Sequence, residues 1–486
     1  MYFAIVADIG GTNSRFQLYS ISASEAVPVK GSRAKGTLIY EEEFSNEKFV
    51  LQNKTFADVF RTFITNSNHV GQPIHVASIA VAGPVHNNKV TFTNNGWSID
   101  GATLREEMGI VGEVQLMNDF VANGYGLLTL DFGAGRGTRS DEEQDIRILQ
   151  DVPRVPGAPI ACVGAGTGLG EVYLTNPYRN ENDDYTAYAS EGGHAEYAPR
   201  TQLEFEMLQF LMEKFKETHR VSVERVVSGR GLAHIYEFLS QHPDYKNKAD
   251  PSIASQFSEA GDLQGKVVAE NVDNDPLCAK AMEIFVIAYG SEAGVAALKF
   301  LPYGGLFLAG GLTPKNLHHI EHGTDEEGGI LTIEDAITRN ITLKCHGKFL
   351  NAFRDKGRLS PVMLKIPVYA VMDQGLGQRG AHFIAVKLLY ELSKTPLDET
   401  STSTSVTTST SASTNTSSHV NDNENTEFSH SQDHQQHHHH HQVSTNHHHC
   451  DHNCFLSWFA VWAPPMIAGS LITVFALKAT KRLNFS

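Results

Sequence analysis

Short apolar runs separated by glycine-rich turns dominate residues 1–397. Two stretches, 4–19 and 159–174, share one pattern: an apolar run, a Gly/Thr turn, and a second run in which polar and apolar residues alternate. Such runs predict strands, and each pair of runs predicts a hairpin. We therefore expect an α/β protein with two related halves, each presenting a backbone turn that could bind a phosphate.

The pattern changes after Pro396. Residues 398–454 are rich in Ser, Thr, Asn and His and almost free of aliphatic residues, so we expect a disordered linker. Residues 455–477 carry no charge, and as a helix of about 34 Å they could span a bilayer core. We expect one transmembrane helix there, followed by a short basic tail at 478–486. Two prolines inside the span leave open a hydrophobic helix docked on the globular part.

Composition narrows the function classes. The formal net charge of −16 argues against a nucleic-acid partner, because phosphate backbones select basic surfaces. The five cysteines are too few and too scattered for a disulfide framework. The first residues lack the basic start of a signal peptide, so we expect the folded part to lie in the cytosol.

The first hairpin carries candidate phosphate-binding and metal-binding groups. Glycines let a backbone approach a phosphate, amides and hydroxyls bind its oxygens, and a carboxylate can hold Mg²⁺. The residues concerned are Asp8, Gly10, Gly11, Thr12 and Asn13. An ordinary Gly-rich turn is the alternative. Residues 164–170 fit neither the Walker A sequence nor the dinucleotide glycine spacing, so phosphate binding here would use paired hairpins.

Three further segments carry polar groups beside strands or glycines. Asn118 and Asp119 end an apolar strand, where a carboxylate could accept a hydroxyl proton, although Asn-Asp is also common as a turn or helix cap. Glu191 and His194 flank two glycines in a loop that could aim both at one small ligand, and a lone Glu-His pair is weak for a metal. Glu224 precedes a Gly-bounded turn and could add a further carboxylate to the site. The alternative is a solvated glutamate on a helix surface, without a ligand.

Taken together, these residues resemble the bacterial-type glucokinases, within the superfamily of hexokinases, actin and heat-shock chaperone ATPases. The resemblance covers nearly all of residues 1–390 and rests on segments in the family's order: 8–13, 82–84, 118–119, 164–170, 191–194, 224–225 and 309–311. The related repressor and sugar-kinase family adds a cysteine-rich zinc motif after its Glu-Gly-Gly-His element. No cysteine occurs between His194 and Cys278, which favours the glucokinase branch.

The resemblance implies a two-lobed actin-like ATPase (ribonuclease H-like) fold with a cleft between the lobes. The small lobe would be 1–117, completed by a returning helix at 372–397, and the large lobe 118–371. The implied reaction is transfer of the γ-phosphate of ATP to the 6-hydroxyl of D-glucose, with Mg²⁺. A homodimer is also implied.

The resemblance also implies residue roles. Asp119 would be the general base, and Asp8 would work with Mg²⁺. The sugar hydroxyls would be held by Asn118, Asp119, Glu191, His194 and Glu224. ATP would be bound by Asp8 and the first hairpin, by the second hairpin and by a later glycine pair: Gly10, Gly11, Thr12, Asn13, Gly164, Ala165, Gly166, Thr167, Gly168, Gly310 and Gly311.

Several alternatives stay open at this point. Mannose, fructose or glucosamine could be the substrate. A different function class, a membrane-tethered sugar sensor or scaffold without efficient turnover, is the alternative hypothesis. The His-rich tract at 419–452 could bind Zn²⁺ or carry no specific site. The uncharged segment would make the protein tail-anchored in an intracellular membrane, with the mitochondrial outer membrane as the hypothesis.

Overall fold

The computed structural model describes residues 1–92, 96–132, 145–177, 185–321 and 347–394. The predicted linker at 398–454, transmembrane helix at 455–477, basic tail at 478–486 and His-rich tract all lie outside the described residues. The described strands form two mixed sheets and one two-stranded ribbon. The predicted α/β class is therefore confirmed for this part of the chain.

The first sheet is built from the N-terminal strands in the order β3-β2-β1-β4-β7. Its strands are β1 Tyr2–Ile9, β2 Asn13–Ile21, β3 Thr37–Ser45, β4 Val76–Val81 and β7 Val114–Asn118; the ribbon consists of β5 Lys89–Thr91 and β6 Ser98–Asp100. The predicted first hairpin is confirmed, since β1 and β2 pair antiparallel. β1, β4 and β7 run parallel, so their carboxyl ends meet at one edge of the sheet. That edge carries Asp8 and Asn118.

The second sheet has the order β11-β10-β9-β12-β13-β8. Its strands are β8 Ile146–Gln150, β9 Ile160–Ala165, β10 Leu169–Thr175, β11 Thr186–Ser190, β12 Gly305–Ala309 and β13 Val368–Val371. β9 and β10 form the predicted second hairpin, and β12 runs parallel to β9. The turn after β9 and the glycine pair after β12 therefore share one edge.

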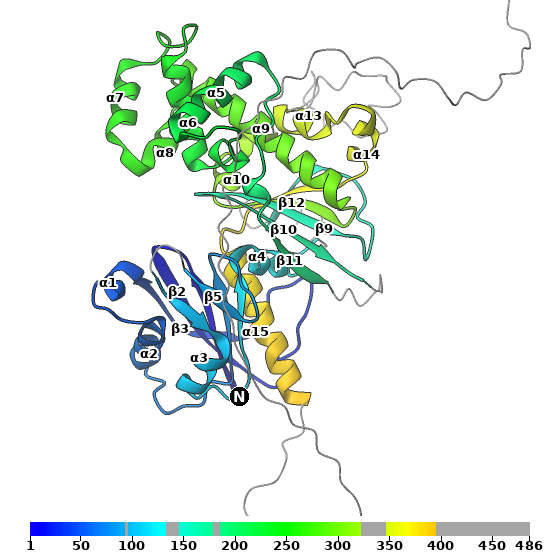
Figure 1. Ribbon diagram of the computed structural model, residues 1–486. Coiled ribbons are helices and arrows are strands. Elements are labelled where there is room, and N and C mark those ends of the chain that lie inside the picture. Colours follow the sequence, from blue (N-terminus) through cyan, green and yellow to red (C-terminus); the bar gives the residue numbers. More distant parts are fainter. Residues whose placement is uncertain (93–95, 133–144, 178–184, 322–346, 395–486) are drawn as a thin grey trace, which may run out of the picture. The chain divides into compact units, whose positions relative to one another are not determined.

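Helices cover both sheets (Figure 1). The α-helices are α1 Asn46–Val50, α2 Phe56–Asn66, α3 Gly101–Met108, α4 Asp119–Leu127, α5 Gln202–Phe215, α6 Gly229–Gln241, α7 Pro251–Glu259, α8 Gln264–Glu270, α9 Pro276–Phe300, α10 Leu312–Lys315, α11 Leu317–Glu321, α13 Lys348–Arg354, α14 Ser360–Met363 and α15 Leu376–Lys394. The 3₁₀ helices are η2 Gly192–His194, η3 Val223–Arg225, η4 Gly261–Leu263 and η6 Gly357–Leu359.

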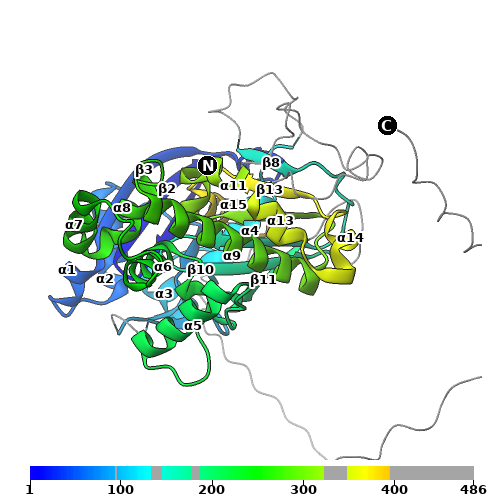
Figure 2. The ribbon, with the colours of Figure 1, turned by 90° about the horizontal axis from the view of Figure 1, so that it is seen from above.

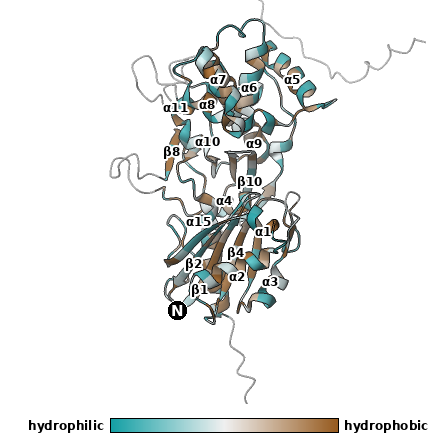
Figure 3. Cartoon of the chain, turned by 90° about the vertical axis from the view of Figure 1, so that its left-hand side faces the viewer, coloured by the Kyte–Doolittle hydropathy of each residue, from teal (hydrophilic) through white to brown (hydrophobic). Residues whose placement is uncertain are grey.

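Helix α9 is the central helix of the second sheet's core. It lies beside α13 (Figure 2) and is apolar on nearly all sides. It is long and apolar enough to cross a membrane, but 72% of its most apolar window is buried inside the fold, as expected for a core helix. Figure 3 shows the apolar colouring along the inner strands of the first sheet, whose core includes a cluster of phenylalanines around Phe16.

Helix α15 returns from the end of the described chain to the first sheet, as Figure 1 shows. Its residues Ala381, Ala385 and Leu389 pack in one buried cluster with Ala4 and Val6 of β1. It also packs closely along α4, which in turn contacts β10 and β11 of the second sheet. Because α4 contacts both sheets, the predicted lobe boundary at 117/118 stays a prediction.

A charged network ties α15 to the loops around it. The buried Arg379 donates to the hydroxyl of Thr129 and pairs with Asp145 at 2.7 Å and Asp373 at 3.2 Å. Arg33, from the loop after β2, also pairs with Asp373, at 2.7 Å. Two cations thus neutralise two carboxylates next to residues 374–378, which line the pocket described below.

Candidate active site

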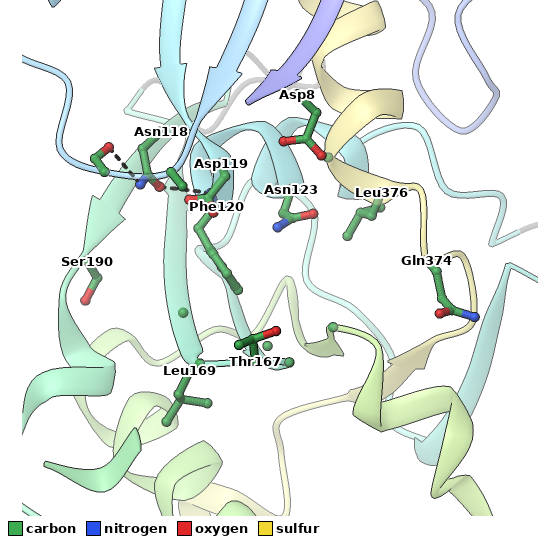
Figure 4. A pocket seen from close by; sticks show the side chains of 18 of the residues that line it. Asp8, Asn118, Asp119, Phe120, Asn123, Thr167, Leu169, Ser190, Gln374 and Leu376 are labelled. Atoms are coloured by element: carbon green, nitrogen blue, oxygen red, sulfur yellow. Dashed lines mark hydrogen bonds between the residues drawn. The ribbon is translucent and has the colours of Figure 1, made fainter. Parts of the chain in front are cut away.

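A pocket of about 660 Å³ opens at the edges where the strands of both sheets end. It is lined by Asp8, Arg15, 82–84, 118–120, Asn123, Gly164, 166–170, 190–191, His194, Glu224, Gly310 and 373–378. Figure 4 shows the side chains of Asp8, Asp119 and Thr167 directed into it. Residues far apart in sequence, predicted separately as sugar-binding and phosphate-binding, thus line one pocket.

Asp119 is the first residue of α4, directly after β7. Its Oδ1 accepts the N–H of Phe120 at 2.9 Å. Burial raises the pKa of Asp119 to about 6, and the nearby charges of Asp8 and Glu191 add to the rise. A carboxyl with this pKa is largely ionised at neutral pH and is still basic enough to accept a proton from a reacting hydroxyl.

Asn118 is the N-cap of α4, the alternative that the sequence left open. Its Oδ1 accepts the N–H groups of Phe120 at 2.9 Å and Val121 at 3.2 Å, and its Nδ2 donates to the carbonyl of Gly83 at 3.2 Å. One N–H of the amide is therefore left for a ligand. The cap also fixes the start of the helix that carries Asp119.

Asp8 faces Arg15 across the first hairpin, since the two are paired in the β1–β2 register. Burial raises the pKa of Asp8, and the charge of Arg15 opposes this rise. Arg15 in turn pairs with Glu43 at 2.7 Å. Arg15 was not among the predicted residues, although its position seven residues after Asp8 follows from the hairpin register.

The turn of the first hairpin is not part of the lining of this pocket. Of its residues Gly10, Gly11, Thr12 and Asn13, none is among the lining residues. The carbonyls of Gly10 and Thr12 accept hydrogen bonds from the side chain and the backbone N–H of Asn46, and the Asn13 amide donates to Glu43 at 2.6 Å. Residues of α1 and β3 thus hold the turn in place. Its binding of phosphate stays a prediction.

The predicted sugar-binding carboxylates reach the pocket from two 3₁₀ helices. Glu191 precedes η2 and lies 3.9 Å from the Nε2 of His194, and both side chains are more than half exposed. Glu224 lies in η3, and its Oε2 accepts the N–H of Leu169 at 2.9 Å. Glu224 is thus tied to the second hairpin and is no free surface carboxylate.

The second hairpin brings its glycines into the pocket. Gly164, Gly166, Thr167 and Gly168 line it, whereas the side chain of Ala165 is buried in the core. A Cβ on Gly170 would lie 2.0 Å from the ring of Phe120, so only glycine admits that ring. Gly310, at φ +81°, also lines the pocket.

A second pocket, of about 850 Å³, adjoins the first at Gly166 and Thr167. Gly311 lies here, with charged and amide side chains that were not predicted: Arg230, Asp262, Lys266, Glu270, Lys315 and Asn316. The run Ser228-Gly229-Arg230-Gly231, which opens α6, was the available signal. A pocket lined by both apolar and cationic side chains fits a nucleoside with attached phosphates.

Metal binding rests on few groups. Within the described residues, no cluster of three or more His, Cys, Asp or Glu side chains could hold a metal ion. Mg²⁺ usually takes one or two carboxylates, with water and phosphate oxygens completing its shell. Asp8, directed into the pocket, fits that requirement (Figure 4).

Comparisons of the sequence and of the fold with known proteins both identify glucokinases as similar. The sequence model of the glucokinase family matches residues 5–328 and 325–388. A glucokinase of Nostoc sp. is 35% identical over 400 residues, which are 80% of this chain and 100% of that protein.

Two solved structures share the fold. That of a glucokinase from an Antarctic psychrotroph has a TM-score of 0.56 at 25% identity, over 80% of this chain and 99% of that one. A glucokinase from Balamuthia mandrillaris, solved in complex with glucose, has a TM-score of 0.56 at 17% identity, over 79% and 94%. The two-lobed actin-like architecture is thus shared with both.

Proposed function

Since this chain belongs to the glucokinase family, we infer that it is an enzyme that transfers the γ-phosphate of ATP to the 6-hydroxyl of D-glucose. The supporting observation is that Asp119 lines one pocket together with Asp8, with Glu191, and with the glycine turn at 166–168. Phosphoryl transfer needs alignment, charge neutralisation and exclusion of water, and this pocket offers groups for each.

In this proposal Asp119 accepts the proton of the attacking hydroxyl. Its position at the amino end of α4, fixed by the Asn118 cap, holds the carboxylate toward the pocket. Glu191, His194 and Glu224 bind the other sugar hydroxyls, and the remaining N–H of Asn118 adds a donor. Paired hydroxyl contacts of this kind reject sugars that lack the matching group.

The nucleotide would occupy the two adjoining pockets. We propose that its adenosine lies in the second pocket beside Gly311, and that its phosphates pass Gly166 and Thr167 toward Asp119. Mg²⁺ bound with Asp8 would neutralise phosphate charge. Arg15, the register partner of Asp8, also lines the pocket and adds a positive charge there.

The substrate is tested by a coupled ADP-release assay with a panel of hexoses. Glucose is expected to give the highest kcat/KM, ahead of mannose, fructose and glucosamine. The control is each sugar without enzyme and enzyme with ATP alone. Turnover of another hexose in preference to glucose would change the substrate, and no turnover of any would overturn the proposed reaction.

Activity is expected to fall on the acid side. Asp119 must be ionised to accept a proton, and its pKa is raised to about 6, so kcat/KM should drop about tenfold for each pH unit below that value. A pH profile of kcat/KM for glucose, with enzyme stability checked at each pH, measures this. A profile that stays flat well below pH 6 would contradict it.

We further propose that residues 455–477 anchor the enzyme in an intracellular membrane, with the catalytic unit in the cytosol. The support is their uncharged composition and length. Deletion of 455–486 is expected to move the protein from the membrane pellet to the soluble fraction without loss of kcat, and co-fractionation with mitochondrial outer membrane tests the site. Equal solubility of both forms would refute the anchor.

A further inference from the structure

Two buried carboxyl groups lie face to face behind the sugar-binding side of the pocket. Glu171 of β10 is 2% exposed and Glu292 of α9 is 6% exposed. Their carboxyl groups lie close enough to interact and could share a hydrogen bond. The buried Oε1 atoms of both have no hydrogen-bond partner among the described residues. A hydrogen bond between them requires one of the two to carry a proton, because two ionised carboxylates have nothing to donate.

Glu171 forms the floor of the loop that presents Glu191 and His194. A Cβ built on Gly192 would lie 2.0 Å from the Oε2 of Glu171, so the loop backbone rests directly on this carboxyl. Glu171 is also the register partner of Ser190, whose hydroxyl accepts the N–H of Gly192 at 3.1 Å. Any movement of the carboxyl is therefore transmitted to Gly192.

Charged groups near the Glu171–Glu292 pair lie on α9 and in the segment after α13. Lys299 on α9 and Lys356 after α13 are the cations near the pair, whereas Cys162 of β9 lies on the opposite face of the sheet, packed with Val172. Lys356 lies against Gly294 and donates to the carbonyl of Ala352 at 2.9 Å, and burial lowers its pKa to about 8. Lys299 lowers the pKa of both carboxyls and Lys356 that of Glu292, but burial, which raises both pKa values, is the larger effect.

Both carboxyls are weak acids in this setting. Burial, followed by the charge of Glu292, raises the pKa of Glu171 to about 8. Burial likewise raises the pKa of Glu292. The pair therefore retains a shared proton at neutral pH and loses it on the alkaline side.

We propose that Glu171 is a positioning residue for the sugar: as a neutral carboxyl bonded to Glu292, it holds Gly192, and with it Glu191 and His194, in the sugar-binding arrangement. This inference rests on the proposed function. Loss of the shared proton leaves two buried negative charges in contact, which repel strongly where water is excluded. The more exposed side of the pair is the loop, since Glu191 and His194 face solvent.

The effect should appear in sugar affinity and leave the chemical step unchanged. Glu171 is not among the residues that line the second pocket and lies beneath the loop, so KM for the hexose should change while kcat and KM for ATP do not. If only the protonated pair binds sugar well, KM at pH 9 should exceed KM at pH 7 by about tenfold.

The experiment measures kcat, KM for ATP and KM for the best hexose of the panel at pH 7, 8 and 9, using the full chain. Glu171→Gln keeps a neutral group able to donate to Glu292, so its KM for the sugar should stay within about threefold across this range. Glu292→Gln should flatten the profile too, because the like charge is gone. Glu283→Gln, on the same helix but paired with Lys280 and Lys348, is the control and should keep the wild-type profile.

The outcomes separate the two proposals. Absence of turnover of every hexose by the wild type overturns the proposed function itself. An active wild type whose KM is flat from pH 7 to 9, or a Glu171→Gln variant that keeps the full alkaline rise, overturns the role of Glu171. Should Glu171→Gln fail to fold, the Glu292→Gln profile decides alone: a retained rise refutes the shared proton, and a flat profile supports it.

Discussion

Asp119→Ala is expected to lower kcat by about two to four orders of magnitude, the usual contribution of a general base. The variant removes the one carboxylate that the sequence resemblance assigns to proton abstraction and that the fold directs into the pocket (Figure 4). Alignment of ATP and sugar by the remaining groups would leave residual turnover. The measurement is single-turnover and steady-state kinetics with saturating glucose and ATP.

Asp119→Asn is the matched variant, because it keeps the size of the side chain and an oxygen for the N–H of Phe120. It should lose turnover to a similar extent. Burial raises the pKa of Asp119, so above that pKa the ionised carboxylate is less favourable in the fold than in the unfolded chain. The melting temperature at neutral pH should therefore not fall in either variant. Retention of more than a tenth of the wild-type kcat would remove Asp119 from its role.

Gly380→Ala is expected to destabilise the folded state by about 1 to 3 kcal/mol through overpacking. A Cβ on Gly380 would lie 1.8 Å from the carbonyl oxygen of Ala122 and 2.6 Å from the N of Gly126. Both contacts are to the backbone of α4, which cannot turn aside as a flexible side chain could. The two helices would have to separate, and activity should fall as well because α4 begins at Asp119.

Gly377→Ala on the same helix provides the stability control. Its Cβ would lie 3.4 Å from the Oδ1 of Asn123, an ordinary contact distance. Alanine favours a helix over glycine by up to about 1 kcal/mol, so this variant should be as stable as the wild type or slightly more stable. Calorimetry of both variants measures the difference. A Gly380→Ala protein that melts with the wild type would show that α15 and α4 can move apart without cost.

The sequence-based prediction of the fold rested on local patterns of apolar and polar residues. The apolar runs and Gly/Thr turns at 4–19 and 159–174 predicted both hairpins, and the β1–β2 and β9–β10 pairings confirm them. Strand alternation is a short-range signal, which explains this success. Which side of each strand faces a helix such as α9 depends on partners distant in sequence, so short-range alternation could not predict it.

The site was predictable where a motif is contiguous. Asp119, Glu191 and Glu224 were named from such motifs, and all three line one pocket. The capping role of Asn118 could only be left as an alternative, because sequence alone does not show which atoms its amide meets. The residues of the second pocket come from the second hairpin, α6, η4, α8 and the segment around α10, and no single segment carries their signal.

Long-range polar contacts were beyond the sequence. Arg33 and Asp373 are 340 residues apart, and nothing in either neighbourhood identifies the other as its partner. The Glu171–Glu292 pair is similar: each residue alone resembles an ordinary surface glutamate on a strand or a helix. Burial on both sides gives these carboxyls their chemistry, and only the assembled fold shows it.

The return of α15 to the first sheet bears on how the protein is made. Ala4 and Val6 of β1 are covered by Ala381 and Leu389, which leave the ribosome only after nearly all of the catalytic unit has been synthesised. Until then this apolar surface stays uncovered on the nascent chain. Folding of the amino-terminal half during translation therefore leaves this surface uncovered, and chains that stop before residue 376 should bind chaperones more than the full chain does.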